Sequence, residues 1–130
     1  EGEGSKIGPV LVAVSGVALV ITGIFPCDPG CVDVSIVGST HSVFAVIAAF
    51  ALTFAPLAIF QTLKKDNRWH SYLAYSLVTT VVALVLSAVY GFNVSEQWKG
   101  LLQRISMGVP LLCVEVMAIR LLQLSIRSSA

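Results

Sequence analysis

The chain has 130 residues, of which 56% are hydrophobic and 12% are charged, whereas an ordinary soluble domain has about 25% charged residues. Eight basic and seven acidic residues are too few to cover the surface of a soluble domain of this size. The net charge is +1 and the basic residues form no single patch, which excludes nucleic acid as an expected partner. The composition therefore predicts a membrane protein whose first partner is the lipid bilayer.

Four segments are long and apolar enough to cross a bilayer, because a helix needs about 20 residues to span a hydrocarbon core of about 30 Å. They cover residues 7–25, 42–63, 70–92 and 98–124. No segment alternates like a barrel strand, and short connections join the last three segments. We therefore expect a single all-α domain over residues 1–130, folded as an antiparallel four-helix transmembrane bundle.

Small residues recur along the first two segments at spacings that let membrane helices approach closely. We expect these residues to lie in helix contacts. The pairs are Ala45 with Ala49, Ala51 with Ala55, and Gly16 with Gly23.

Most of the basic residues fall on one side of the predicted bundle. Lys6 precedes the first segment, and Lys64, Lys65 and Arg68 lie in the second connection. Arg120 and Arg127 lie near the end of the fourth segment, whereas the first connection contains no Lys or Arg. By the positive-inside rule, both termini are cytoplasmic, and the first and third connections lie outside a plasma or inner membrane.

The first connection contains a turn signal between two cysteines. Asp28, Pro29 and Gly30 suit successive positions of a β-turn, because proline fixes φ and glycine permits positive φ. Cys27 and Cys31 flank this turn. In an oxidising exterior they form either a structural disulfide or two free thiols, since sequence spacing alone does not decide the geometry. A redox role is a weaker alternative, because the spacing is not Cys-x-x-Cys.

The segment Gly23-Ile24-Phe25-Pro26, followed by Asp28 and then His41, resembles the signature of the bacterial membrane-protein family catalogued as domain of unknown function 998. Members of that family typically have about six membrane helices, whereas the length criterion gives four here. The resemblance thus implies the C-terminal four helices or a shortened relative. It implies a fold and a membrane location but no reaction, because the family has no established activity. It marks Gly23, Pro26, Asp28 and His41 as the characteristic loop.

Asp28 and His41 are the polar candidates of that loop. We expect the carboxylate of Asp28 to hydrogen-bond to the imidazole of His41 across the first connection. Such a pair is either a clasp at the helix entrance or a proton or ligand site. The clasp is favoured, because no nucleophile or second ligand accompanies the pair in the sequence.

The fourth segment carries Arg104 and Glu115 at membrane depth. They are three helical turns apart, so they share a face at an axial separation of about 16 Å and are too distant to pair with each other. Because an intramembrane charge is costly, we expect each to have its own partner. Arg104 should snorkel toward the first connection and reach Asp28.

Glu115 should face the interior of the bundle for the same energetic reason. The groups expected at its depth are Gln61 on the second segment and Tyr75 and Ser76 on the third. We expect Glu115 to hydrogen-bond to one or more of these side chains.

No cofactor or metal site is predicted. His41 and His70 begin helices at opposite ends of the predicted bundle, about 30 Å apart, so they cannot be the two axial ligands of one haem. Too few reactive side chains converge to predict an enzyme.

Three functions stay open. The first is a non-enzymatic accessory or structural subunit that packs against other subunits of a larger membrane complex. The second is a small-molecule, lipid or proton-handling protein that uses Arg104, Glu115 and the pair of Asp28 and His41 around a cavity below Pro110. The third and weakest is a membrane thiol oxidoreductase that uses the two cysteines of the first connection.

Overall fold

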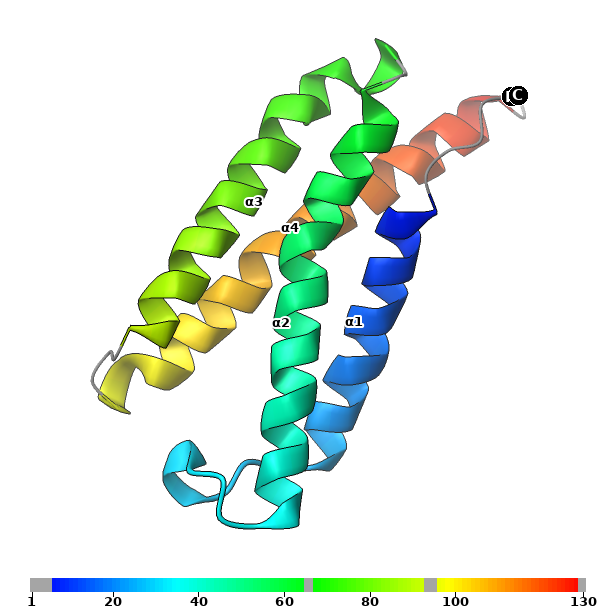
Figure 1. Ribbon diagram of the computed structural model, residues 1–130. Helices are drawn as coiled ribbons and strands as arrows, with labels where there is room; N and C mark the ends of the chain where they lie inside the picture. The colour runs from blue at the N-terminus through cyan, green and yellow to red at the C-terminus, as the bar shows by residue number, and fades with distance from the viewer. Residues whose placement is uncertain (1–5, 65–66, 93–95, 129–130) are drawn as a thin grey trace.

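The computed structural model describes residues 6–64, 67–92 and 96–128, and these form four long helices (Figure 1). No strand occurs among the described residues, which confirms the all-α prediction. Each helix is long and apolar enough to cross a membrane, so the chain has the makeup of a multi-pass membrane protein. The elements are α1 (Ile7–Ile24), η1 (Pro29–Cys31), α2 (Ile36–Leu63), η2 (Asn67–Trp69), α3 (His70–Gly91) and α4 (Glu96–Ser128).

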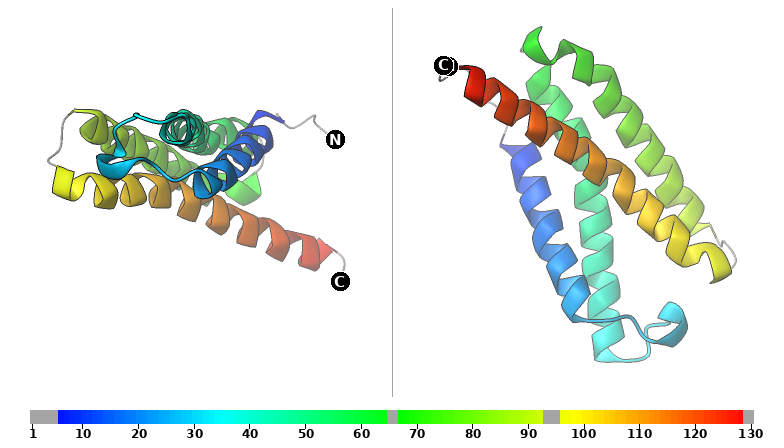
Figure 2. Two further views of the ribbon diagram at one scale, coloured as in Figure 1. Left: turned by 90° about the horizontal axis from the view of Figure 1, so that it is seen from below. Right: turned by 180° about the vertical axis from the view of Figure 1, so that it is seen from behind.

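The helices are arranged as two pairs, α1 beside α2 and α3 beside α4 (Figures 1 and 2). The pairs are separated at the loop end of the molecule, which carries η1, and they approach each other at the junction end, where η2 leads from α2 to α3. α4 packs on α3 and α2, whereas α1 packs mainly on α2. One side of α4 therefore remains open along much of its length.

The junction end holds the main apolar cluster. Leu63, Trp69, Cys113 and Met117 are buried there and bring α2, η2 and α4 together. The ring of Trp69 meets that of Tyr72 edge-on, with centroids 5.7 Å apart, a favoured aromatic geometry. This cluster fixes the end at which the two helix pairs converge.

Two further contacts tie the helices together at and near this end. The hydroxyl of Ser76, which is fully buried, donates a hydrogen bond to the carbonyl oxygen of Pro56 at 2.5 Å and so joins α3 to α2. The guanidinium of Arg120 lies 5.9 Å from the ring centroid of Tyr72, within cation–π range.

Small side chains line the contact between α1 and α2. Gly8 makes the closest approach, because a Cβ atom at this position would lie 2.6 Å from Cγ1 of Ile59 and 3.3 Å from its backbone nitrogen. A Cβ atom at Gly16 or Gly23 would meet nothing within 4 Å, so the prediction that these two glycines serve helix packing is wrong. Ala51 and Ala55 are buried, in agreement with the expectation that they lie in helix contacts. Ser15, Ala18 and Ala48 are further small buried residues on these two helices.

Two helices are longer than predicted. α2 begins at Ile36 rather than at residue 42, and α4 covers Glu96–Ser128 rather than residues 98–124. Ser35 explains the early start of α2, because its Oγ accepts the backbone N–H of Gly38 at 3.1 Å, as an N-cap residue does. The first connection is correspondingly shorter than the sequence suggested.

Replacing Gly8 with Ala should destabilise the protein by about 1–3 kcal/mol, because the new methyl group overpacks the contact with Ile59. Gly16→Ala is the matched control, since its methyl group enters open space and alanine favours a helix by up to about 1 kcal/mol. Thermal unfolding in mild detergent measures both. Equal melting temperatures for the two variants would contradict close packing at Gly8.

Candidate functional site

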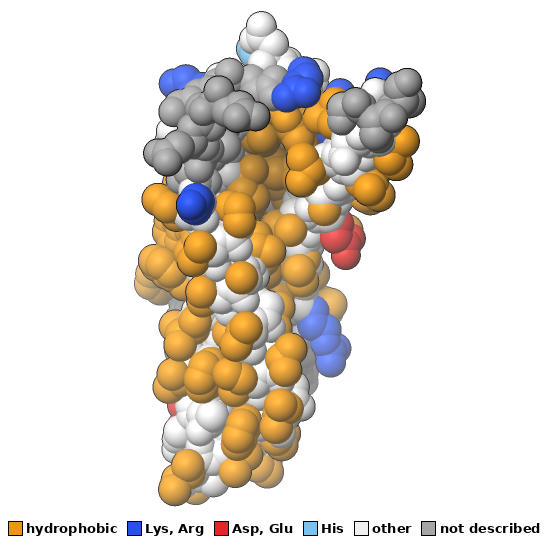
Figure 3. Space-filling model, turned by 90° about the vertical axis from the view of Figure 1, so that its right-hand side faces the viewer, with side chains coloured by type: hydrophobic (Ala, Val, Ile, Leu, Met, Phe, Trp, Pro, Cys, Tyr) orange, Lys and Arg blue, Asp and Glu red, His pale blue; other side chains and the backbone are white. Residues whose placement is uncertain are grey.

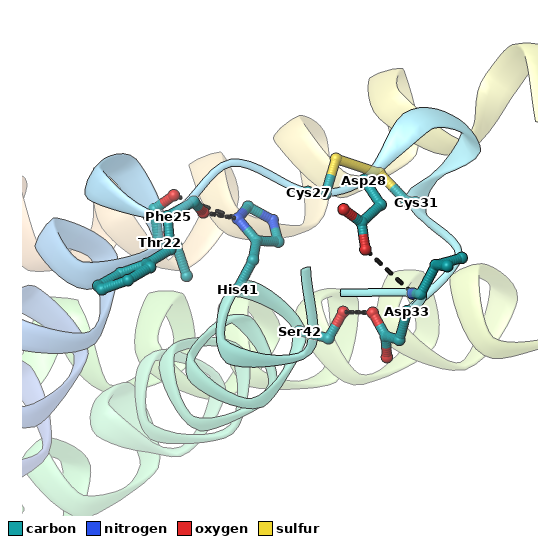
Figure 4. Close-up of a disulfide and its surroundings, with 9 residues drawn as sticks. Thr22, Phe25, Cys27, Asp28, Cys31, Asp33, His41 and Ser42 are labelled. Carbon is teal, nitrogen blue, oxygen red and sulfur yellow. Dashed lines mark hydrogen bonds between the residues drawn. A yellow bond between two sulfur atoms is a disulfide. The ribbon is translucent and has the colours of Figure 1, made fainter. Parts of the chain in front are cut away.

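The first connection forms the predicted turn. The backbone N–H of Cys31 donates to the carbonyl oxygen of Asp28 at 2.7 Å. Gly30 has φ 74° and ψ 4°, which is the third-position geometry of a type II turn. Cys31 follows with φ 51°, a left-handed conformation that is uncommon outside glycine. The turn directs the carboxylate of Asp28 toward the start of α2 (Figure 4).

Asp28 organises the start of α2. Its Oδ2 accepts the backbone N–H groups of Val34 at 3.0 Å and Ser35 at 2.8 Å, and its Oδ1 accepts the hydroxyl of Ser35 at 2.7 Å. The backbone and side-chain hydrogen bonds from Ser35, with a smaller contribution from Val34, hold the pKa of Asp28 below its usual value of 3.8. The carboxylate therefore acts as an ionised structural cap rather than as an acid.

Gly38 makes room for this cap. A Cβ atom at position 38 would lie 2.6 Å from Cγ of Asp28 and closer still to its Oδ2. The carboxylate can thus sit against the first turn of α2 only while residue 38 has no side chain. Sequence reasoning missed both Ser35 and Gly38, although Ser35 is a readable N-cap signal.

His41 binds the end of α1 rather than Asp28. Its Nδ1 lies 2.7 Å from the carbonyl oxygen of Phe25 and 3.1 Å from that of Thr22 (Figure 4). The predicted hydrogen bond between Asp28 and His41 is therefore wrong, because each group is used elsewhere. Asp28 caps α2, whereas His41 satisfies carbonyl groups that the end of a helix leaves without intrahelical partners.

Cys27 and Cys31 are paired as a disulfide across the turn, with their Cα atoms 5.2 Å apart. This separation is within the usual range for disulfides. The third cysteine, Cys113, is buried on α4 with a free thiol. Of the two alternatives that the sequence left open, a disulfide or two free thiols, the structure has the disulfide.

The two charged residues of α4 do not find the partners predicted for them. Glu115 is exposed rather than facing the interior, and the exposed side chains of Gln61 and Tyr75 make no hydrogen bond to it among the described residues. Ser76 bonds to Pro56 instead. The physical reason is that α4 turns Cys113 and Met117 toward the core, which leaves Glu115 on the open side.

Arg104 is likewise exposed, and no ion pair joins it to Asp28 within the described part of the chain. The carboxylate of Asp28 is already engaged by Val34 and Ser35. Figure 3 shows acidic and basic side chains within the otherwise apolar flank of the molecule. The prediction of an Arg104–Asp28 contact is therefore wrong for this chain by itself.

A cavity of about 420 Å³ lies between α2, α3 and α4 toward the loop end. His41 lines it, but Asp28, Arg104 and Glu115 do not. α4 contributes Gln103, Ser106 and Met107 instead, so its polar contribution to the cavity is uncharged. Sequence reasoning missed these residues, because isolated amides and hydroxyls in an apolar helix carry no positional signal.

Among the described residues, no three His, Cys, Asp or Glu side chains gather closely enough to hold a metal ion. A comparison with family models matches residues 1–120 to the family described as protein of unknown function DUF998. The chain therefore belongs to this family. No curated protein and no solved structure matches it.

Replacing Gly38 with Ala should lower the melting temperature by several degrees, because the methyl group displaces the carboxylate of Asp28 from its cap. Gly23→Ala is the control, since a methyl group there meets nothing within 4 Å. The stabilisation from Asp28 is present above pH 3.8 and is lost as the pH falls through its lowered folded-state pKa. Thermal melts of both variants and wild type over a pH series measure this. A Gly38→Ala protein as stable as the control at neutral pH would contradict the steric argument.

The non-reduced protein should have an intact mass two hydrogens below that of the reduced protein, because Cys27 and Cys31 are bonded. Alkylation after unfolding without reductant should label only Cys113. Cys27→Ser is the control, and it should make Cys31 available for labelling. Three labelled cysteines in protein purified under non-reducing conditions would contradict the pairing.

Proposed function

We propose that this protein is a non-enzymatic membrane subunit that packs against a larger membrane complex through the open side of α4. The observation that carries the proposal is the exposure of Arg104 and Glu115 within a helix apolar enough to span a bilayer. Each charge costs a few kcal/mol at membrane depth when lipid surrounds it. A protein partner that covers this side and pairs with the charges removes that cost.

The spacing of the two charges indicates where a partner would carry its complementary groups. Arg104 and Glu115 lie three turns apart, or about 16 Å along the axis. A complementary transmembrane helix would therefore carry a carboxylate at the depth of Arg104 and a hydrogen-bond donor or cation at the depth of Glu115. The surface between the two charges is apolar, with Leu111 and Leu112 exposed, which suits van der Waals contact between helices.

A second copy of the chain fits this side less well. The proposed orientation has consecutive helices antiparallel, with both termini cytoplasmic and the first and third connections outside, as the positions of Lys64 and Arg68 favour. Two copies with this common orientation would place Arg104 beside Arg104 and Glu115 beside Glu115 at equal depth. Like charges in a low-dielectric setting repel, so the charge pattern favours a different protein.

Arg104→Gln and Glu115→Gln should each reduce recovery of the partner at fixed stoichiometry, because each removes one charged contact. Arg127→Gln is the matched control, since Arg127 is exposed on the same helix beyond the two charges. Purification from the native membrane in mild detergent, with quantitative mass spectrometry of the complex, measures the result. Both glutamine variants should themselves stay folded, because neither charge has a partner among the described residues.

Photo-crosslinking locates the contact independently. A crosslinker at Leu112 on α4, which is 59% exposed, should capture the partner, whereas one at Val81 on α3, which is 57% exposed, should capture lipid. Crosslinks only between copies of this chain would replace the proposal with a homo-oligomer. Equal capture from both positions, or a pure and stable single chain without partners, would overturn it.

A further inference from the structure

The cavity between α2, α3 and α4 is polar near the loop end and mainly apolar further along α2. His41 and Tyr90 line it near the loop end, and Phe50, Thr53 and Phe54 line it further along α2. From His41 to Phe54, the groove along α2 extends about 20 Å at 1.5 Å per residue. Its volume of about 420 Å³ is within the range of about 300–1,000 Å³ usual for small-ligand sites. From this geometry we infer a binding site for an uncharged membrane amphiphile with an alcohol head group.

The absence of charge in the lining defines the ligand class. None of the described residues that line the cavity is Lys, Arg, Asp or Glu. A phosphate or carboxylate head would therefore be transferred from water into a largely apolar space without a counter-ion, which is strongly unfavourable. A hydrocarbon or isoprenoid chain matches the two phenylalanines, and its polar end must be neutral.

His41 indicates that the head group donates a hydrogen bond. The carbonyl oxygens of Thr22 and Phe25 only accept, so Nδ1 must carry the proton. In the neutral imidazole, Nε2 is then an acceptor, and it has no partner among the described residues. An alcohol O–H satisfies it, whereas an ether or a ketone does not. The hydrogen bonds from Nδ1 to α1 thereby fix the orientation of the imidazole ring, whose Nε2 is the atom available to a ligand.

Other polar side chains lie along the same space. Ser42 and Ser106 also line the cavity. The hydroxyl of Ser42 donates a hydrogen bond to Asp33, and that of Ser106 donates one to the backbone carbonyl oxygen of Gln103. The hydroxyl of Tyr90 and the side-chain amide of Gln103 make no hydrogen bond within the described part of the chain. Both side chains therefore keep hydrogen-bond donors available to a ligand in the cavity.

The cavity is reachable from the side of the bundle. Val46 and Phe50 line it and are also 68% and 63% exposed. The two helix pairs also lie further apart at the loop end than at the junction end (Figures 1 and 2). A ligand dissolved in the bilayer can therefore enter between α2 and the other pair without passing through water.

Three photoactivatable probes with one hydrocarbon chain test the site: the primary alcohol, its methyl ether and its phosphate monoester. The full-length protein is labelled in phosphatidylcholine vesicles, and peptide mass spectrometry locates the labels. The alcohol should label residues of the cavity at least about tenfold more efficiently than the ether or the phosphate, which corresponds to about 1.4 kcal/mol. Equal labelling by the phosphate or the ether would overturn the inference.

His41→Asn separates ligand binding from the clasp. The asparagine amide can still donate to the carbonyl oxygens of α1, but it lacks an atom in the place of Nε2. This variant should keep its melting temperature and lose the preference for the alcohol over the ether. A retained preference would contradict the role of Nε2.

Ala49→Phe tests the cavity itself, because its ring would fill the groove beside Phe50. Val43→Phe is the control, since Val43 is 56% exposed on the same helix and does not line the cavity. Ala49→Phe should abolish labelling of the cavity while Val43→Phe leaves it unchanged. Melting temperatures show whether a loss of labelling results from unfolding of the variant. If Ala49→Phe is unfolded, the labelling of His41→Asn decides whether the site exists. Unchanged labelling of folded Ala49→Phe would overturn the site.

Discussion

The carboxylate of Asp28 is the constraint on which the loop end depends. It receives three hydrogen bonds from Val34 and Ser35, and these fix where α2 starts. Since α2 is helical from Ile36, its starting point sets the direction of the side chains in its first turns, including His41. His41 in turn reaches the carbonyl groups at the end of α1. One carboxylate thus positions the contact between the first two helices and the polar end of the cavity.

The pattern of charge on α4 follows from how the helices are paired. In a closed four-helix bundle, α1 would face α4 and cover it. Here α1 packs mainly on α2, with Gly8 closely against Ile59, and α4 packs mainly on α3 and α2. The core takes Cys113 and Met117 from α4. Glu115 and Arg104 consequently lie on the side that no described helix covers.

The sequence predicted well those features that depend on composition and local chemistry. Four apolar segments of sufficient length gave the four helices, and the residues Asp28, Pro29 and Gly30 gave the turn with its positive φ at Gly30. The family resemblance rested on the same loop and is confirmed by the family match. These features need no knowledge of how distant segments pack, so the amino-acid sequence determines them directly.

The contacts between segments were predicted poorly, and for a physical reason. Asp28 and His41 are both able to bond to backbone groups, and backbone groups are far more numerous than side-chain partners. The carboxylate therefore capped α2 and the imidazole capped α1. The prediction of partners for Glu115 assumed that groups of this same chain compensate the energetic cost of a charge in the membrane. A membrane helix can also meet that cost through another protein, and no pattern in one sequence distinguishes the two.

α4 separates the two surfaces that carry the functional proposals. Gln103 and Met107 face the cavity, whereas Arg104 and Glu115 lie on the exposed side. A partner on the exposed side and an amphiphile in the cavity would therefore contact neighbouring sides of one helix. If partner binding shifts α4 relative to α2, the cavity changes shape and the affinity for the amphiphile changes with it. Thermodynamic linkage then requires the amphiphile to alter the affinity for the partner by the same factor. A rigid α4 would leave the two binding events independent, so the motion of this helix decides whether the protein only binds the two or also couples them.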